Sequence, residues 1–538
     1  MRFNDARLRW CALRELQTAG TLTSSRRANA RFADAAALAP ALLRRRPNWE
    51  NSMHCYRHHS YAPYVFSIAV LASAQVARAQ SEDKSPGSLE ERLEFLEQKE
   101  ALRAAKDAEA AKQSAAATKA TTPETEGPAP FAFADFSWSP GNSGASEKPY
   151  SFGPLSGELR VDVAYHHELS RPKDDSVSGS SEVFRSDEFQ LTQLGIGGDF
   201  YYKGVQARLM TQFGLYSQTT PRNDPSVSRG QWNLDNAYRY ISEAYGGYHL
   251  KYLSGINIQA GIFMSYVGLW SYYNFDNWTY QPSYVSSNTP WFFNGMRIQI
   301  FPTDKLKIEP WLVNGWQAYG RFAEAPGVGL QVLWKPTGWL TFLGNQYFGT
   351  DTLGNLKRQR MHTDDSAMVK YYDNPSGFLS KAAASLTLDA GCETGGGVAC
   401  RTQFFLGFMA YNRFWFLHDT FGLTVGGGAI TNPGRYLVLM PPINGATAFS
   451  GTPYFTANPK DPFDAWDGQV TIDYMPLPFI TFRFEYTHRA ASVPYFTGAS
   501  GVTPPGGNQG SPGSMVEGWN PDLVYTEDRF TGALLVKI

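Results

Sequence analysis

The sequence predicts an all-β protein, a transmembrane antiparallel β-barrel of about 16 strands, and three observations support this fold class. The 538 residues are 14% aromatic but only 18% charged, whereas soluble domains carry about a quarter charged residues. No run of about 18 apolar residues occurs, which argues against transmembrane helices. From residue 150 onward, apolar and polar residues alternate in segment after segment.

The alternation has the two-residue period of strands that face lipid on one side and water on the other. In residues 159–166, Leu, Val, Val and Tyr alternate with Arg, Asp, Ala and His. The same period recurs in residues 205–213, 385–389 and 469–474. A soluble sheet with one buried face would alternate in the same way, so the connections must distinguish the two folds.

The connections between the predicted strands are alternately short and long along the whole segment. The short set comprises residues 203–204, 251–255, 302–305, 335–338, 373–377, 417–420 and 475–478. The long set comprises residues 171–186, 219–236, 269–290, 317–325, 350–365, 391–400, 431–462 and 490–521. Outer-membrane barrels have tight periplasmic turns and long external loops, so this order predicts a barrel with both ends in the periplasm.

The chain before the barrel divides by composition. Residues 1–52 are rich in Arg and are interpreted as an upstream extension of a chain that starts at Met53; an Arg-rich organellar transit peptide is the competing interpretation. Residues 53–79 contain the basic region, apolar stretch and small-x-small cleavage site (Ala77-Arg78-Ala79) of a signal peptide. This signal predicts export through the periplasm to the outer membrane.

Two further segments separate the signal peptide from the barrel. Residues 80–113 predict a short periplasmic helix, because Leu89, Leu93 and Leu96 share one helical face. A solvated helix and a coiled coil that assists a homotrimer are both compatible with so short a stripe. Residues 114–149, rich in Ala, Thr, Pro and Gly, predict a linker, and residues 150–538 form the predicted barrel.

Charge and cysteine content agree with export. Residues 1–79 hold 12 Arg and 4 acidic residues, so 36 basic and 45 acidic residues remain, a net charge of −9. Such a chain is not expected to bind nucleic acid. Only Cys392 and Cys400 lie beyond the leader, and their pairing in a disulfide is predicted for an oxidising compartment.

Several short motifs resemble one family. Glu243-Ala244-Tyr245, the run from Gly255 to Gly261, Pro290-Trp291 and Gly295-x-Arg297 resemble the putative beta-barrel porin-2 family of bacterial outer-membrane proteins. The resemblance extends over residues 150–538. It implies an outer-membrane porin fold surrounded by membrane lipid, and it names no solute. Unlike many outer-membrane barrels, the chain ends without a terminal aromatic residue.

A barrel of 16 strands encloses a water-filled lumen, so we expect a passive diffusion channel for small hydrophilic solutes or ions. A barrel hydrolase and a surface-binding barrel without an open pore are the alternatives. His362 with Asp364 and Asp365 is the best catalytic or metal-binding candidate, but a solvated loop explains these residues. No catalytic residue, cofactor or metal site is predicted.

The inward positions of the alternating strands provide the pore-lining candidates, which are Arg160, Arg208, Glu243, Arg297, Lys307, Glu309, Arg413, Arg483 and Glu485. The wider inward set adds Lys370, Lys381, Arg401, Arg529, Asp162, Asp389, Asp473 and Glu527. This set is more basic than acidic, which predicts a weak preference for anions.

The third long connection, residues 269–290, is unusually aromatic for a segment that faces water. Its candidate constriction residues are Trp270, Tyr273, Asp276, Trp278 and Tyr280. Three interpretations stay open: the loop folds into the lumen and narrows the pore, it packs against the rim or a neighbouring subunit, or it binds a ligand such as a sugar ring. If the loop folds inward, Asp276 is expected to oppose wall arginines such as Arg297 and Arg208.

Overall fold

The computed structural model describes residues 128–141, 149–180, 182–221, 224–228, 230–321, 323–351, 357–436, 462–503 and 520–538. The predicted upstream extension, signal peptide and periplasmic helix precede residue 128 and lie outside the described residues.

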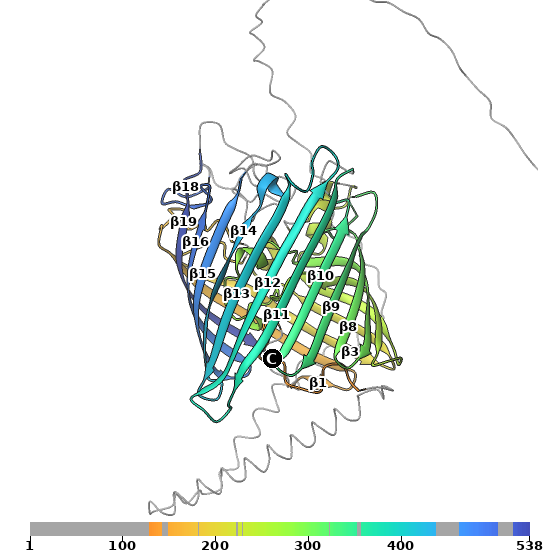
Figure 1. The fold of residues 1–538 in the computed structure, drawn as a ribbon. Coiled ribbons are helices and arrows are strands. Elements are labelled where there is room, and N and C mark those ends of the chain that lie inside the picture. Colours follow the sequence, from red (N-terminus) through yellow and green to blue (C-terminus); the bar gives the residue numbers. More distant parts are fainter. Residues whose placement is uncertain are drawn as a thin grey trace, which may run out of the picture. The chain divides into compact units, whose positions relative to one another are not determined.

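The described residues form a closed antiparallel β-barrel (Figure 1). Its sixteen strands are β2 (Leu155–Glu168), β3 (Phe189–Tyr202), β4 (Val205–Thr211), β5 (Ile241–Leu250), β6 (Ile256–Met264), β7 (Phe292–Thr303), β8 (Leu306–Val313), β9 (Gly327–Thr337), β10 (Leu340–Gly349), β11 (Gln359–Asp373), β12 (Leu379–Thr394), β13 (Phe404–Phe416), β14 (Phe421–Thr431), β15 (Asp464–Leu477), β16 (Ile480–Ala491) and β19 (Thr526–Lys537). Each strand pairs with the next, and β19 pairs with β2 to close the barrel. The predicted fold class is confirmed.

Short turns and long connections alternate as the sequence predicts (Figure 1). One of the two-residue turns joins β3 to β4 through Lys203 and Gly204, whose φ angles are 49° and 87°. Positive φ at both central residues matches the right-handed twist of the flanking strands. The connections of the long set carry small elements: α3 (Tyr216–Thr219), η3 (Pro225–Ser228), α4 (Leu234–Ala237), η4 (Asn274–Asp276), α5 (Tyr284–Ser287), η5 (Pro433–Arg435), β17 (Phe496–Thr497) and β18 (Leu523–Val524).

The prediction that residues 350–365 form a loop is wrong in its second half. Strand β11 begins at Gln359 and pairs with β10 over ten positions, so His362, Asp364 and Asp365 lie in a strand. His362 and Asp364 are buried inside the barrel, whereas Asp365 is exposed on the other face of the strand. A barrel strand accepts polar residues on its inner face. The polar composition of this stretch therefore resembled a loop.

Burial alternates along the barrel strands, with large apolar side chains exposed on the outer face. β1 (Ser151–Phe152) adds a two-residue pairing to β2. Within the described ranges, no helix is long and apolar enough to cross a membrane. The buried aromatic side chains lie largely inside the barrel, where connections fold back onto the inner wall.

Candidate functional site

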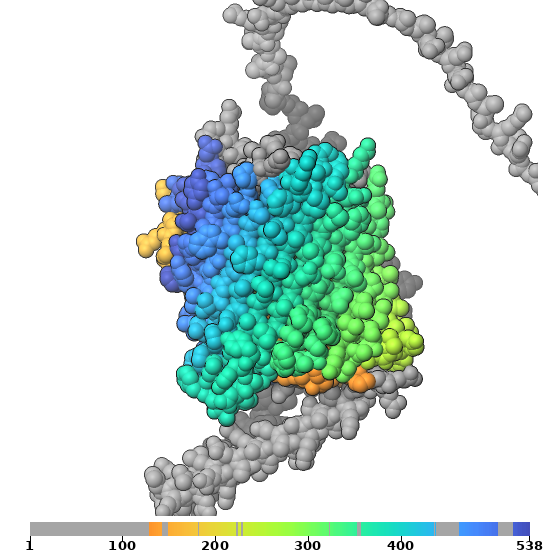
Figure 2. Space-filling model, in the orientation of Figure 1, coloured from red at the N-terminus to blue at the C-terminus, as the bar shows by residue number. Residues whose placement is uncertain are grey.

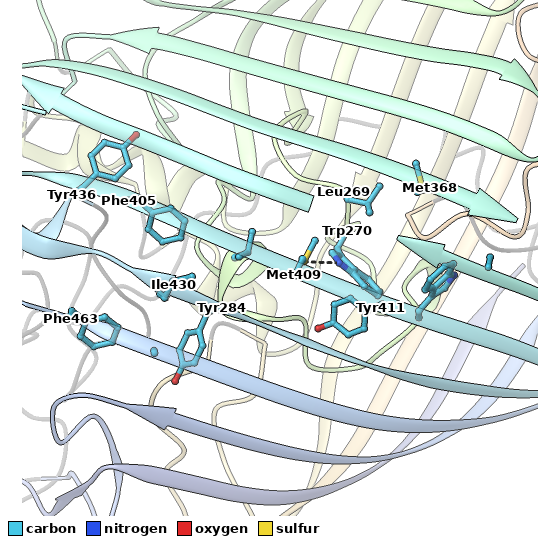
Figure 3. Packing of buried hydrophobic residues seen from close by; sticks show 14 of the residues in the cluster. Leu269, Trp270, Tyr284, Met368, Phe405, Met409, Tyr411, Ile430, Tyr436 and Phe463 are labelled. Atoms are coloured by element: carbon cyan, nitrogen blue, oxygen red, sulfur yellow. Dashed lines mark hydrogen bonds between the residues drawn. The ribbon is translucent and has the colours of Figure 1, made fainter. Parts of the chain in front are cut away.

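The connection between β6 and β7, residues 265–291, lies inside the barrel lumen. Trp270, Trp278 and Tyr284 belong to a buried cluster with side chains of the inner wall. Figure 3 shows Trp270 beside Met409 of β13, and its indole N–H lies 3.2 Å from the Met409 sulfur. All five candidate constriction residues are less than 10% exposed. Trp270 and Trp278 belong to this cluster, whereas Tyr273, Asp276 and Tyr280 are buried outside it.

Arg483 of β16 holds the backbone of this loop. Its guanidinium donates hydrogen bonds to the carbonyl oxygens of Asn274, Asn277 and Thr279 at 2.7–3.0 Å. Arg413 of β13 donates a longer bond, of 3.3 Å, to the Trp278 carbonyl. The carbonyl groups of a loop that leaves its sheet need such donors once they are buried.

Carboxylates of the inner wall bind the loop from the same side. Glu485 accepts the backbone N–H groups of Tyr280 and Gln281 at 2.6 and 2.7 Å. Asp467 of β15 accepts the N–H of Tyr284 at 2.7 Å. Asp162 of β2 accepts the Tyr280 hydroxyl at 3.1 Å. The loop is thus fixed by side chains of β2, β13, β15 and β16.

Asp276 does not take the partners that the sequence suggests. Its carboxylate pairs with Arg160 of β2 and Lys537 of β19, each at 2.9 Å. Arg160 also lies 3.9 Å from the ring centre of Tyr273. Arg208 instead pairs with Glu158, Asp199 and Glu243, and Arg297 pairs with Glu309, so neither arginine forms an ion pair with Asp276.

The opposite wall, from β4 to β9, carries its own ion pairs. Arg208 binds Glu243 at 3.0 Å, and Glu309 accepts both Lys307 at 2.5 Å and Arg297 at 3.5 Å. Six of the nine pore-lining candidates therefore sit in ion pairs beside or across from the loop. Arg413, Arg483 and Glu485 contact the loop itself. Arg160 also contacts it through Asp276, and Glu243 through the Tyr273 hydroxyl. Arg401, from the wider inward set, lies exposed in the connection after β12.

A cavity of about 420 Å³ remains between the loop and the wall. Its lining includes Arg160, Glu243, Trp270, Tyr273, Asp276 and Lys537. Burial raises the pKa of the Tyr273 and Tyr280 hydroxyls well above the usual value. Both therefore stay neutral at physiological pH and act as hydrogen-bonding groups of the loop.

Residues 128–141, inside the segment predicted as a linker, also enter the barrel. Trp138 is 1% exposed, and its indole N–H donates to the Gly338 carbonyl at 3.1 Å. The Trp138 carbonyl accepts the indole N–H of Trp278 at 3.2 Å, and Gly141 donates to the Asp276 carbonyl at 2.9 Å. The segment therefore joins the turn between β9 and β10 to the loop. Four aromatic residues within eight positions were the available signal in the sequence.

His362 and Asp389 form the best remaining candidate for chemistry. His362 Nε2 lies 2.9 Å from an Asp389 carboxylate oxygen, and its Nδ1 lies 2.9 Å from the Tyr436 hydroxyl. The two ring nitrogens of His362 thus lie beside Asp389 of the inner wall and beside Tyr436, the residue that follows η5. Among the described residues, no group of three or more His, Cys, Asp or Glu side chains could hold a metal ion.

The Cys392–Cys400 disulfide is present, with the Cα atoms 4.9 Å apart. It links the C-terminal part of β12 to the connection before β13.

The sequence profile of the putative beta-barrel porin-2, OmpL-like family matches residues 154–512. No curated protein matches the sequence. Solved structures similar to the chain include the outer-membrane channel DcaP of Acinetobacter baumannii, at 11% identity over 71% of this chain and 96% of that one, with a TM-score of 0.39. OprB of Pseudomonas putida has 10% identity over 71% and 94%, and a TM-score of 0.41. The anion-selective porin from Comamonas acidovorans has 9% identity over 71% and 99%, and a TM-score of 0.41.

The family match covers most of the closed barrel, and it agrees with an antiparallel wall whose lumen is narrowed by a folded loop. The chain belongs to the putative beta-barrel porin-2, OmpL-like family of outer-membrane porins.

Proposed function

We propose that solutes cross this porin between the loop of residues 265–291 and the wall of β4 to β9. The observation that carries the proposal is the anchoring of the loop backbone by Arg483, Glu485 and Asp467 on one side of the lumen. The loop also reaches the wall of β4 to β9, where the Tyr273 hydroxyl donates to Glu243 at 2.8 Å and Gln331 donates to the Tyr266 carbonyl at 2.7 Å, and the cavity of about 420 Å³ lies beside these contacts. Small hydrophilic solutes and ions then diffuse down their gradients, and no chemical step is needed.

The charges around this path support weak selectivity. Five basic side chains form ion pairs there with five carboxylates: Arg160, Arg208, Arg297, Lys307 and Lys537 with Glu158, Asp199, Glu243, Asp276 and Glu309. Because the two signs balance, their fields largely cancel a few ångströms from the wall. We therefore expect a weaker anion preference than the excess of basic over acidic residues among the inward-facing candidates predicts.

We also propose that the barrel has no hydrolytic activity. The pair formed by His362 and Asp389 resembles part of a catalytic triad. However, the second ring nitrogen of His362 faces the phenol of Tyr436, at the place where a triad would put a serine hydroxyl. This geometry supports a structural role for His362. A purified sample that hydrolyses phospholipid or peptide substrates, and loses the activity in His362→Ala, would contradict this proposal.

Planar-bilayer recordings test the channel. We expect discrete conductance steps, with a reversal potential near zero in a salt gradient. Deleting residues 274–283 should raise the single-channel conductance clearly, while the folded barrel keeps its resistance to SDS without heating. A folded barrel with no conductance would favour a surface-binding protein. An unchanged conductance after the deletion would show that the loop does not narrow the path of the solutes.

Export and assembly complete the proposal. Cleavage of residues 53–79 as a signal peptide would leave Gln80 as the first residue, which N-terminal sequencing of the outer-membrane protein can check. A first residue well before Gln80 would contradict this cleavage.

We propose that the barrels associate as a homotrimer. Light scattering in detergent tests this through the protein mass, and a monomeric mass would contradict it.

A further inference from the structure

The outer face of the barrel is apolar away from the strand ends, except in one place. Among the described barrel strands, mid-strand polar side chains gather on the outer face of β10 to β13. We call this surface the β10–β13 patch; it comprises Gly344, Gln346, Thr363, Asp365, Ala367, Ala384, Ala410 and Asn412. These strands face the viewer in Figure 1, and Figure 2 shows the surface that they form.

Asp365 lies on the outer face of β11, away from the strand ends. It is exposed, and its neighbour across the strand pair is Gly344. Gly344 lies between the outward aromatic residues Phe342 and Phe348, two positions from the first and four from the second, and these residues are 38% and 41% exposed. Outward aromatic residues mark the two interfaces of a membrane barrel, so Asp365 lies between these interfaces.

The hydrogen bonds of Asp365 are few and lie on the same exposed surface. Its carboxylate accepts the Thr363 hydroxyl at 2.8 Å and a long bond of 3.4 Å from the Gln346 amide. A charge on the lipid face of a barrel is most destabilising at the bilayer midplane. A second outward carboxylate, that of Asp528, pairs with His488 near the ends of β19 and β16 at the rim of the long connections, where head groups and water reach it.

Beside Asp365 the patch is hollow. A depression of about 580 Å³ is lined by Leu340, Ala367, Ala384, Ala410, Asn412 and Val425. The Asn412 side-chain oxygen accepts the Tyr371 hydroxyl at 2.8 Å, which leaves the amide N–H groups of Asn412 to face outward partners. Small side chains let another protein surface approach closely, as they do between membrane segments.

We propose that the β10–β13 patch packs against a second copy of this chain. A lipid tail could fill the hollow, but it offers no hydrogen-bond donor to Asp365. Another copy presents both a carboxylate acceptor and amide donors at the same depth in the membrane. The patch therefore carries groups of both kinds, and around a three-fold axis different parts of the patch would meet. This inference rests on the proposed homo-oligomer and names the face through which it forms.

Two matched positions test the coverage of the patch. Ala410 of the patch and Ala260 of β6 are both outward, exposed alanines, and Cys392 and Cys400, the two cysteines beyond the predicted leader, are joined in a disulfide. The variants Ala410→Cys and Ala260→Cys, each labelled with a maleimide fluorophore, are reconstituted in vesicles that contain brominated phospholipids. We expect at least threefold weaker quenching at position 410 than at position 260. Equal quenching would show that lipid covers both positions and would overturn the proposal.

Bulky substitutions at the same positions separate this inference from the proposed assembly. Ala410→Trp should convert the oligomer to a monomer in light scattering, whereas Ala260→Trp should leave its mass unchanged; resistance to SDS without heating shows that each barrel is folded. If Ala410→Trp is still an oligomer, the β10–β13 patch is not the interface, but the proposed oligomer is not contradicted. A monomeric wild type would overturn both, and neither outcome bears on conductance.

Discussion

Arg483 and Asp473 form a two-point ion pair on the inner wall, with Nε–Oδ1 and Nη2–Oδ2 distances of 2.7 and 3.0 Å. Both side chains are almost fully buried. The pair fixes the plane of the guanidinium, and its remaining N–H groups point at three carbonyl oxygens of the loop. A bidentate pair orients a donor group as well as binding it. The loop position therefore depends on a contact between β15 and β16.

Replacing Arg483 tests this dependence. Arg483→Gln removes the donors of three loop carbonyl groups, and losing one partner of a buried ion pair typically costs about 3–5 kcal/mol. The cost should be smaller here, because Arg413 still pairs with Asp473 at 2.8 Å. We expect larger open-channel current noise and a higher mean conductance.

The matched control for that experiment is Arg297→Gln. This substitution removes an arginine from the opposite wall, where it pairs with Glu309 rather than with the loop. Its current noise should equal that of the wild type. If both variants record the same quiet current, Arg483 does not hold the constriction.

Trp138 leads to a second prediction. It joins the Gly338 carbonyl of a periplasmic turn to Trp278 of the loop, and its side chain is buried. Trp138→Ala should release residues 128–141 and increase conductance, while the barrel keeps its melting temperature. A buried Trp-to-Ala change usually lowers the free energy of unfolding by about 3–5 kcal/mol. Here we expect residues 128–141 to detach from the barrel interior instead, with the barrel itself staying folded.

Conductance and thermal melting of Trp138→Ala, recorded on the same preparation, check this expectation. Phe133→Ala is a suitable control, because Phe133 belongs to the same segment but is 39% exposed. A lower melting temperature with unchanged conductance would assign Trp138 to barrel stability instead.

The sequence predicts the barrel well because the strand period is local. Leu159 and Val161 face outward and Arg160 and Asp162 inward, as the alternation requires. The interior could not be predicted in the same way. Asp276 lies 116 residues from Arg160 and 261 residues from Lys537, and nothing local selects these partners over Arg208 or Arg297.

Two other differences have physical reasons of the same kind. His362 and Asp364 resembled a solvated loop because an inner barrel face accepts polar residues as readily as a loop does. Trp138 lies in a segment with no periodic pattern, so only its burial in the three-dimensional structure reveals its contacts. In both cases the position of the side chain depends on residues that are close in the folded barrel but distant in the sequence.

The disulfide allows a third prediction. Cys392 and Cys400 are separated by eight positions, and closing so short a loop stabilises a fold by roughly 2–3 kcal/mol at most. Because the bridge lies at the tip of β12 and β13, its reduction should lower the melting temperature slightly and leave conductance unchanged. Melting curves with and without reductant, beside a Cys392→Ser/Cys400→Ser variant, measure this. A change in conductance on reduction would connect this tip to the pore.

The balance of charges across the lumen gives the last prediction. Glu309 is 1% exposed and pairs with both Lys307 and Arg297. Glu309→Gln leaves these two cations without their carboxylate, so the lumen gains a net positive charge and should favour anions. Arg297→Gln leaves Glu309 paired with Lys307, removes a positive charge and should favour cations. We expect roughly twofold changes in the permeability ratio, in opposite directions.

Reversal potentials in a KCl gradient measure both signs, and ionic strength provides the control. The Debye length is about 10 Å at 0.1 M salt and about 3 Å at 1 M. A field that acts across an aqueous gap should therefore shift the reversal potential at low salt and lose most of its effect at high salt. If the two variants shift in the same direction, or the shifts persist at 1 M, the selectivity does not arise from these wall charges. It would then have to come from the loop, where Asp276 stays paired with Arg160 and Lys537 in both variants.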